Sequence, residues 1–136
     1  MRIFIDSPLL IYLNTLKSPE LRTAYESFYL DLLSNHRTYS DILVLDELIY
    51  ISKRKYNIPY DVTLNFKESI VLPYVEILPL GLKEFEKAAE ILKSIAIKPS
   101  DALHAAVMIV NGISKMVSED REFNKIKEIE RIWPSR

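Results

Sequence analysis

The sequence contains no cysteine and only two glycines among its 136 residues. Without cysteine, disulfides, zinc–thiolate sites and thiol chemistry are excluded, and the composition is consistent with a reducing compartment. Two glycines cannot build the Gly-rich loop that cradles phosphates, so no nucleotide-binding fingerprint is present. No run approaches the roughly 18 apolar residues that a membrane span requires. The chemistry of the chain must therefore come from other residue types.

A leader sequence and an excess of positive charge are also missing. The chain begins "MRIFID", with no basic leader, apolar stretch and small-residue cleavage site, so we expect a cytoplasmic protein with no membrane partner. The formal net charge is −1, whereas a protein that binds nucleic acid through its overall charge carries an excess of Lys and Arg. Contact with nucleic acid would need a local patch. The densest candidate is "SKRKY" at 52–56, although a solvated helix C-terminus explains it slightly better.

The composition that remains, 49% hydrophobic and 27% charged, is typical of a globular protein, and 136 residues suggest one domain over 1–136. Short apolar runs predict strands, here listed by residue number: 2–6, 36–39, 74–80, 114–118 and 128–134. Helical spacing and start signals predict helices over 7–14, 18–35, 40–56, 60–72, 81–95 and 98–110. The alternation of strands and helices indicates an α/β protein with a mostly parallel sheet.

Two aspartates end predicted strands. Asp6 follows the first apolar run directly, and Asp120 closes the strand in "MVSED". In open parallel sheets, ligands bind beyond the carboxyl ends of the strands, so these two acids would face one crevice. Each could equally cap the helix that follows it, and the neighbouring Glu119 leaves open which acid points inward.

Two further acids lie in predicted helices. Asp101 in "KPSDALHAA" occupies a first turn, where it complements the helix dipole, so alone it is better explained as a helix cap than as a ligand. If Ser100 supplies the cap oxygen, Asp101 can point to a metal. Glu47 belongs to "ILVLDELIYI", in which eight of ten residues are apolar. A carboxylate in so apolar a helix needs a partner or a metal, unless Asp46 and Glu47 occupy a narrow exposed stripe.

Acids that converge without Lys or Arg repel one another, and a hard divalent cation relieves that repulsion. Mg²⁺ and Mn²⁺ prefer oxygen ligands and bind through a few carboxylates together with substrate phosphates. Such ions activate water and stabilise the oxygens of an in-line phosphoryl displacement. His36 and His104, the only two histidines, are too few for a His-based zinc site unless carboxylates complete it. We interpret His104, alone on an apolar helix, as a satisfied core or rim residue.

Four short motifs, in order, resemble those of the PIN domain, a family of metal-dependent ribonucleases that includes the VapC-type toxins. They are "FIDSPLLIY", "VLDELIY", "KPSDALHAA" and "VSEDREFNKI", and together they span nearly the whole chain. The departures are Pro8, where the family often has a small polar residue, and Ser118, where it usually has threonine. Neither departure removes a carboxylate, so the chain is similar to catalytically competent members.

The resemblance implies a three-layer α/β/α sandwich with a central, mostly parallel sheet of about five strands. It further implies an endoribonuclease that depends on Mg²⁺ or Mn²⁺ and cleaves RNA. The family's metal-holding and catalytic acids fall on Asp6, Glu47, Asp101 and Asp120. Ser7 and Ser118 would orient those carboxylates. RNA contacts would come from Lys53, Arg54, Lys55 and Arg121.

The resemblance also implies partners: RNA as substrate, a second copy in a homodimer, and a small antitoxin that occludes the pocket with a basic side chain. Two alternatives stay open, a catalytically silent module of the same fold that binds RNA or protein, and an RNA-maturation nuclease without an antitoxin. A phosphorylated receiver domain shares the layered architecture. That class requires an acidic pair after the first strand, whereas "IDSP" supplies one acid.

Overall fold

A five-stranded parallel sheet lies at the centre of the protein, as seen in a computed structural model that describes residues 1–134. Its strands are β1 (Arg2–Ile5), β2 (Arg37–Asp41), β3 (Glu76–Leu78), β4 (Lys115–Val117) and β5 (Glu130–Ile132). The spatial order is β3-β2-β1-β4-β5, so the first strand of the chain is the middle strand of the sheet. In register, Ile3 of β1 lies opposite Thr38 on one side and Lys115 on the other.

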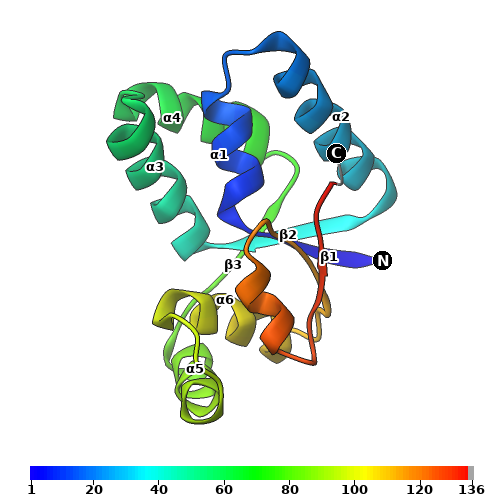
Figure 1. The fold of residues 1–136 in the computed structure, drawn as a ribbon, viewed down its shortest axis with the longest axis vertical. Coiled ribbons are helices and arrows are strands. Elements are labelled where there is room, and N and C mark those ends of the chain that lie inside the picture. The colour runs from blue at the N-terminus through cyan, green and yellow to red at the C-terminus, as the bar shows by residue number, and fades with distance from the viewer. Residues whose placement is uncertain (135–136) are drawn as a thin grey trace.

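Helices cover both faces of this sheet (Figure 1). The helical segments are α1 (Ser7–Thr15), α2 (Pro19–Asn35), α3 (Ile42–Tyr56), α4 (Tyr60–Phe66), the π-helical η1 (Lys67–Val71), α5 (Leu82–Ser94), α6 (Pro99–Val110) and the 3₁₀-helical η2 (Arg121–Lys125). The first four α-helices lie on one side of the sheet, and α5 and α6 lie on the other. The predicted three-layer sandwich is confirmed.

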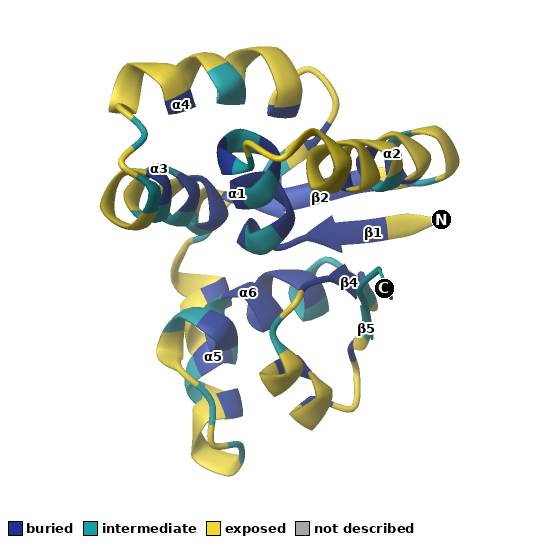
Figure 2. Cartoon of the chain, turned by 45° about the horizontal axis from the view of Figure 1, so that its top comes forward, coloured by how far each residue is buried: buried dark blue, intermediate teal, exposed yellow. Residues whose placement is uncertain are grey.

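The core is densest around β1, because this strand has neighbours on both edges and helices on both faces. Ile3, Phe4 and Ile5 are completely buried, which accounts for the uninterrupted apolar run in the sequence. Figure 2 shows β1 dark along its length apart from its first residue. At the far end of α1, Asn14 donates hydrogen bonds to the hydroxyls of Ser52 and Thr63, so a polar contact ties α1 to α3 and α4.

Two predicted elements differ in detail. The helix expected over 60–72 is α4 followed by η1, so its hydrogen-bonding pattern widens before Pro73. In α5 the apolar face that carries Leu82, Phe85 and Leu92 points to solvent, with Leu82 71% exposed. The adjacent face, which includes the buried Ala88 and Ile91, packs against α6. Among residues 1–134, no helix has the length and apolar character needed to cross a membrane.

Candidate active site

The candidate site lies where β1 and β4 end. Asp6 follows β1, and its backbone N–H donates to the carbonyl of Val117, so the backbone pairing continues one residue beyond the strand. Ser118 follows β4, and its backbone N–H donates to Ile132 of β5. The parallel arrangement therefore brings residues from opposite ends of the chain to one edge, as the sequence predicted.

Asp6 is held by two hydrogen bonds, one to each carboxylate oxygen. Its Oδ1 accepts from the backbone N–H of Ser7 at 2.8 Å, which makes Asp6 the N-cap of α1. Its Oδ2 accepts from the hydroxyl of Ser118 at 2.6 Å. Burial raises the pKa of Asp6 above its usual value, although these hydrogen bonds and the nearby His104 oppose the shift. Pro8 sits in the first turn of α1, where its missing N–H leaves no hydrogen bond unmade.

Ser118 links two of the acids. While its hydroxyl donates to Asp6, the same oxygen accepts from the backbone N–H of Asp120 at 3.1 Å. The Asp120 carboxylate caps η2 through the N–H of Glu122 and is half-buried. Glu119 is exposed and accepts a hydrogen bond from Tyr12, so Asp120 is the acid on the inner side.

Asp101 is buried without a full set of partners. It lies in the first turn of α6 and is 6% exposed, yet its Oδ2 makes no hydrogen bond within the described part of the chain. Burial, followed by repulsion from Asp120, raises the pKa of Asp101 to about 6. The predicted cap is wrong, because α6 begins after Lys98 and no side chain, including that of Ser100, caps it. Asp101 is therefore not explained as a helix cap.

Glu47 and its neighbour Asp46 have different surroundings. Asp46 is exposed, whereas the Glu47 side chain is 22% exposed and its Oε1 lies 2.9 Å from Nε2 of His104. The alternative that one exposed stripe holds both acids is wrong, since they are about 100° apart on the helix.

The sequence did not assign a site role to His104 or Asp41. His104 is 1% exposed, and its Nδ1 lies 2.7 Å from Oδ2 of Asp41, which is fully buried at the start of α3. Its neighbouring carboxylates raise the pKa of His104 well above the usual value, although burial acts in the opposite direction. Two polar residues within apolar runs are the only sequence signal that distinguishes this pair.

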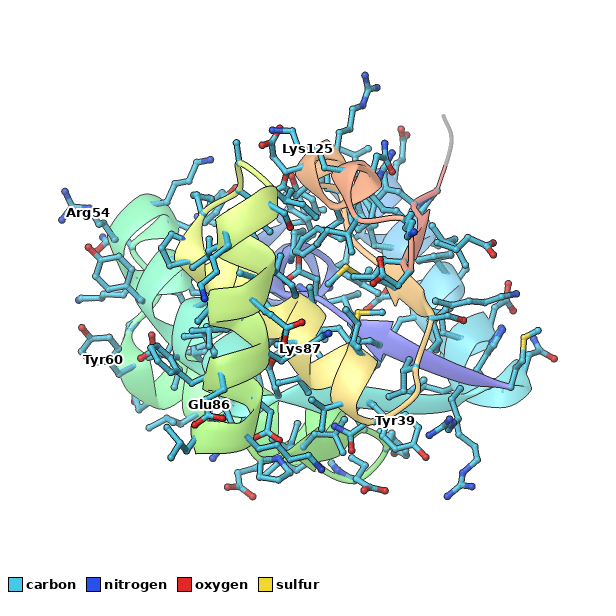
Figure 3. All side chains as sticks on the ribbon, turned by 90° about the horizontal axis from the view of Figure 1, so that it is seen from below. Tyr39, Arg54, Tyr60, Glu86, Lys87 and Lys125 are labelled. Atoms are coloured by element: carbon cyan, nitrogen blue, oxygen red, sulfur yellow. The ribbon has the colours of Figure 1, made fainter. Side chains whose placement is uncertain are left out.

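The predicted RNA-contacting residues are not gathered at the carboxylates. Lys53, Arg54 and Lys55 are exposed in the last turn of α3, and Figure 3 shows Arg54 at the outer edge of the molecule. A helix rises about 1.5 Å per residue, so this cluster begins about 9 Å along the axis from Glu47. Arg121 is exposed and directly follows Asp120 in the chain.

The donor atoms fit a hard divalent cation. A carboxylate oxygen of Asp6, one of Glu47 and a ring nitrogen of His104 lie within 4.8 Å of one another, and Asp101 adds a buried oxygen without a hydrogen-bond partner. Oxygen-rich sets of this kind suit Mg²⁺ and Mn²⁺. No Lys or Arg forms an ion pair with these acids in the described residues.

A family model for the PIN domain matches residues 3–129. The chain belongs to the PIN domain family. A comparison with curated protein sequences finds no match. Among solved structures, this PIN domain is similar to VapBC2 from Rickettsia felis, bound to a DNA fragment from its promoter, with a TM-score of 0.74, 20% identity and 98% coverage of each chain.

Two further structures have the same fold as this PIN domain. DNA-bound VapBC from Salmonella typhimurium has a TM-score of 0.72 at 19% identity, with 98% of each chain covered. VapC20 from Mycobacterium tuberculosis, described as a Sarcin-Ricin loop cleaving toxin, has a TM-score of 0.72 at 17% identity. That match covers 90% of this chain and 92% of the other. The fold is therefore that of VapC proteins.

Proposed function

We propose that this PIN domain is a metal-dependent endoribonuclease. The observation that carries the proposal is the Oδ2 atom of Asp101, buried without a partner while burial and Asp120 raise the pKa of its carboxyl group. An unpaired carboxylate costs stability in the apolar interior and needs an opposite charge. A bound cation would supply that charge, and family membership supports nuclease chemistry.

The four acids and the metal have separate roles in this proposal. Asp6, Glu47, Asp101 and Asp120 would hold Mg²⁺ or Mn²⁺. When bound, such an ion supplies charge stabilisation and water activation for phosphodiester cleavage.

Two serines would fix the geometry of these acids. Ser118 orients Asp6 through its hydroxyl and Asp120 through that residue's backbone N–H. Ser7 restrains the other oxygen of Asp6 through its own backbone N–H. RNA would approach over Arg121, with Lys53, Arg54 and Lys55 guiding more distant phosphates.

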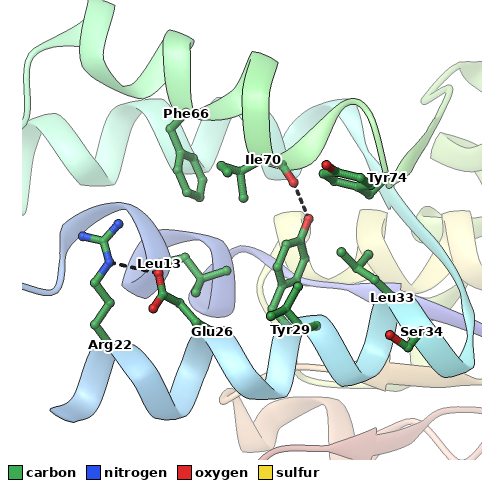
Figure 4. Close-up of a pocket in the computed structure, with 10 residues that line it drawn as sticks. Leu13, Arg22, Glu26, Tyr29, Leu33, Ser34, Phe66, Ile70 and Tyr74 are labelled. Atoms are coloured by element: carbon green, nitrogen blue, oxygen red, sulfur yellow. Dashed lines mark hydrogen bonds and ion pairs between the residues drawn. The ribbon is translucent and has the colours of Figure 1, made fainter. Parts of the chain in front are cut away.

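Within this proposal the protein is the toxin of a toxin–antitoxin pair. A groove between α1, α2 and the α4–η1 segment offers a place for the antitoxin (Figure 4). Its apolar lining comprises Leu13, Tyr29, Leu30, Leu33, Phe66, Ile70 and Tyr74. Arg22 and Glu26 form an ion pair of 3.3 Å at one end. An amphipathic antitoxin helix would fill this groove, and a basic side chain beyond it would occupy the acidic pocket.

The second partner in this proposal is another copy of the chain. The face of α5 that carries Leu82, Phe85 and Leu92 is apolar and exposed. A monomer gains nothing from exposing such a patch, whereas a twofold contact would bury it. We therefore assign α5 to the interface of a homodimer.

The direct test is RNA cleavage by purified protein with Mg²⁺ or Mn²⁺. We expect cleavage by the wild type, at least about 100-fold slower cleavage by Asp6→Asn and Asp101→Asn, and none in a chelator. Equal cleavage by all three proteins would indicate a contaminant or a different site. Absence of cleavage by the wild type on total cellular RNA would support the silent binding module.

A second experiment separates a toxin from a maturation nuclease. Induced expression should arrest growth and create new RNA 5′ ends, and Asp101→Asn should do neither. Growth arrest that persists in Asp101→Asn would contradict the nuclease assignment. New 5′ ends without growth arrest would support a maturation nuclease.

A further inference from the structure

His104 lies among three carboxylates from three elements of the chain. Its Nδ1 is 2.7 Å from Oδ2 of Asp41, and its Nε2 is 2.9 Å from Oε1 of Glu47 and 3.8 Å from Oδ1 of Asp6. The imidazole is 1% exposed, so water does not satisfy either nitrogen from outside. The two short contacts therefore leave Asp41 as the polar partner of one ring nitrogen and Glu47 as the polar partner of the other.

Asp41 connects this imidazole to the helix that carries Glu47. Its Oδ1 accepts from the backbone N–H of Val44 at 2.9 Å, which caps α3, while Oδ2 faces His104. Both oxygens of a fully buried carboxylate are thus used. Capping a helix takes only one side-chain oxygen, such as a serine or threonine supplies. The second oxygen of Asp41 is therefore available to orient the imidazole ring of His104.

We propose that His104, oriented by Asp41, is a positioning residue that fixes the Glu47 carboxylate in the metal site. This inference rests on the proposed function. Among the described residues, the Glu47 carboxylate has no hydrogen-bond partner other than His104. The contact with His104 therefore decides where its carboxylate lies. Through its contacts with Asp41 and Glu47, His104 also joins α6 to the start and to the second turn of α3.

If His104 were only a core residue, as the sequence suggested, its ring nitrogens would need hydrogen-bond partners and nothing more. For a neutral imidazole, Asp41 would accept from the one N–H, and the other nitrogen would need a donor rather than a second carboxylate. The second contact aims at a predicted metal-holding acid, and residues that orient such ligands change metal affinity about 10- to 100-fold when replaced. Affinity for metal is therefore the quantity that separates the two roles.

The first experiment uses metal-free protein and does not depend on activity. With ¹⁵N-labelled histidine, we expect each ring nitrogen of His104 to report on the carboxylate that it contacts. Asp41→Asn should shift mainly the Nδ1 signal, and Glu47→Gln mainly the Nε2 signal. An Nε2 signal that does not respond to Glu47→Gln would overturn the proposal.

The second experiment is a double-mutant cycle on Mn²⁺ affinity, measured from the EPR signal of free Mn²⁺. We expect His104→Gln to weaken binding about 10- to 100-fold. In the Glu47→Gln background, the same change should cost no more than about twofold, because two residues that act through one contact are not additive. Full additivity would mean that His104 acts independently of Glu47 and would overturn the proposal.

Tyr29→Phe is the matched control for stability. It removes a hydrogen bond of 2.6 Å from the Tyr29 hydroxyl to the Ile70 carbonyl, and neither residue belongs to the proposed metal site. The change should lower the melting temperature without changing Mn²⁺ affinity. Asp41→Asn keeps the shape of the cap and serves as a second variant if His104→Gln unfolds. If the wild type binds Mn²⁺ and His104→Gln binds it equally well, this inference is overturned but the proposed function is not. Wild type that does not bind Mn²⁺ overturns the proposed function.

Discussion

Asp101 combines a buried position with a charge that the metal-free protein does not compensate. Its Oδ2 lacks a hydrogen bond, and both burial and Asp120 oppose its ionisation. Residues kept in such positions commonly serve a site at the expense of stability. The free energy of unfolding should report this cost as the carboxyl group ionises.

The sign of the pH dependence follows from the raised pKa. Between the usual value of 3.8 and about 6, the folded state holds a proton on Asp101 that the unfolded state releases. Stability therefore falls as the pH rises through this range. We expect the free energy of unfolding of metal-free Asp101→Asn to exceed that of the wild type by on the order of 1 kcal/mol above pH 6. Below pH 3.8 the two proteins should differ little in stability.

Urea unfolding of both proteins below pH 3.8 and above pH 6 measures this difference. Asp6 and His104 are present in both proteins, and burial and Asp120 are the leading causes of the raised pKa of Asp101, so the difference in stability reports mainly on Asp101. A difference in stability that is independent of pH would contradict the assignment.

Ser118 offers a test of how the acids are oriented. Ser118→Ala removes the hydroxyl that donates to Asp6 and accepts from the N–H of Asp120, so we expect cleavage to fall about 10- to 100-fold. Ser118→Thr keeps the hydroxyl and should retain most activity, at some cost in packing because the position is fully buried. Initial rates of RNA cleavage measure both effects. Equal rates for the alanine variant and wild type would remove Ser118 from the site.

At the level of single residues, the sequence predicted the strand ends and helices on which the four acids lie, because these elements can be read from local patterns. It did not predict the contact between Asp41 and His104. That contact joins the start of one helix to the middle of another, 63 positions apart, and no local pattern encodes it. The assignment of the inward acid between Glu119 and Asp120 likewise depended on Tyr12, which lies far away in the chain.

Among the elements, α5 carries its most apolar face outward. We expect Phe85→Ser to raise the dissociation constant of the homodimer at least about 10-fold, since central aromatic side chains dominate many interfaces. Sedimentation velocity measures the change, with Leu21→Ser, an exposed leucine of α2, as the control. A wild type that is monomeric at all concentrations would contradict the assignment of α5.

The groove between α1, α2 and α4–η1 makes a different prediction. Leu30→Glu places a charge in the apolar lining, and Leu30 is 61% exposed, so the fold should tolerate the change. We expect the proposed antitoxin, when co-expressed, to rescue growth with wild type but not with Leu30→Glu. RNA cleavage by the purified variant should equal that of wild type. Leu21→Glu, on the same helix but outside the groove, is the control.

The elements themselves were largely predictable, since proline and serine mark most helix starts and apolar runs mark the strands. Two features were not. The orientation of α5 depends on what packs against it, because Leu82, Phe85 and Leu92 share a face that any apolar layer could cover. The change from α4 to η1 depends on the path toward Pro73 and β3, which is set by tertiary structure.

On the scale of the whole molecule, the proposed metal ties β1, α3, α6 and the segment after β4 into one site. A ligand that binds only the folded state stabilises it by about 2.7 kcal/mol at 100 times its dissociation constant. We expect Mn²⁺ at such a concentration to raise the melting temperature of wild type by several degrees, and that of Asp6→Asn hardly at all. Scanning calorimetry measures both. Equal shifts would indicate binding elsewhere.

The central position of β1 has a consequence for synthesis. Of the five strands, β1 is translated first, but its two neighbours in the sheet, β2 and β4, follow only at residues 37–41 and 115–117. Asp6 meets its partner Ser118 across 112 positions of sequence. A nascent chain therefore carries no complete acidic pocket until Asp120 has been translated. For a proposed ribonuclease, the strand order delays activity until β4 and the residues after it are made, and products of translation interrupted before them lack the site.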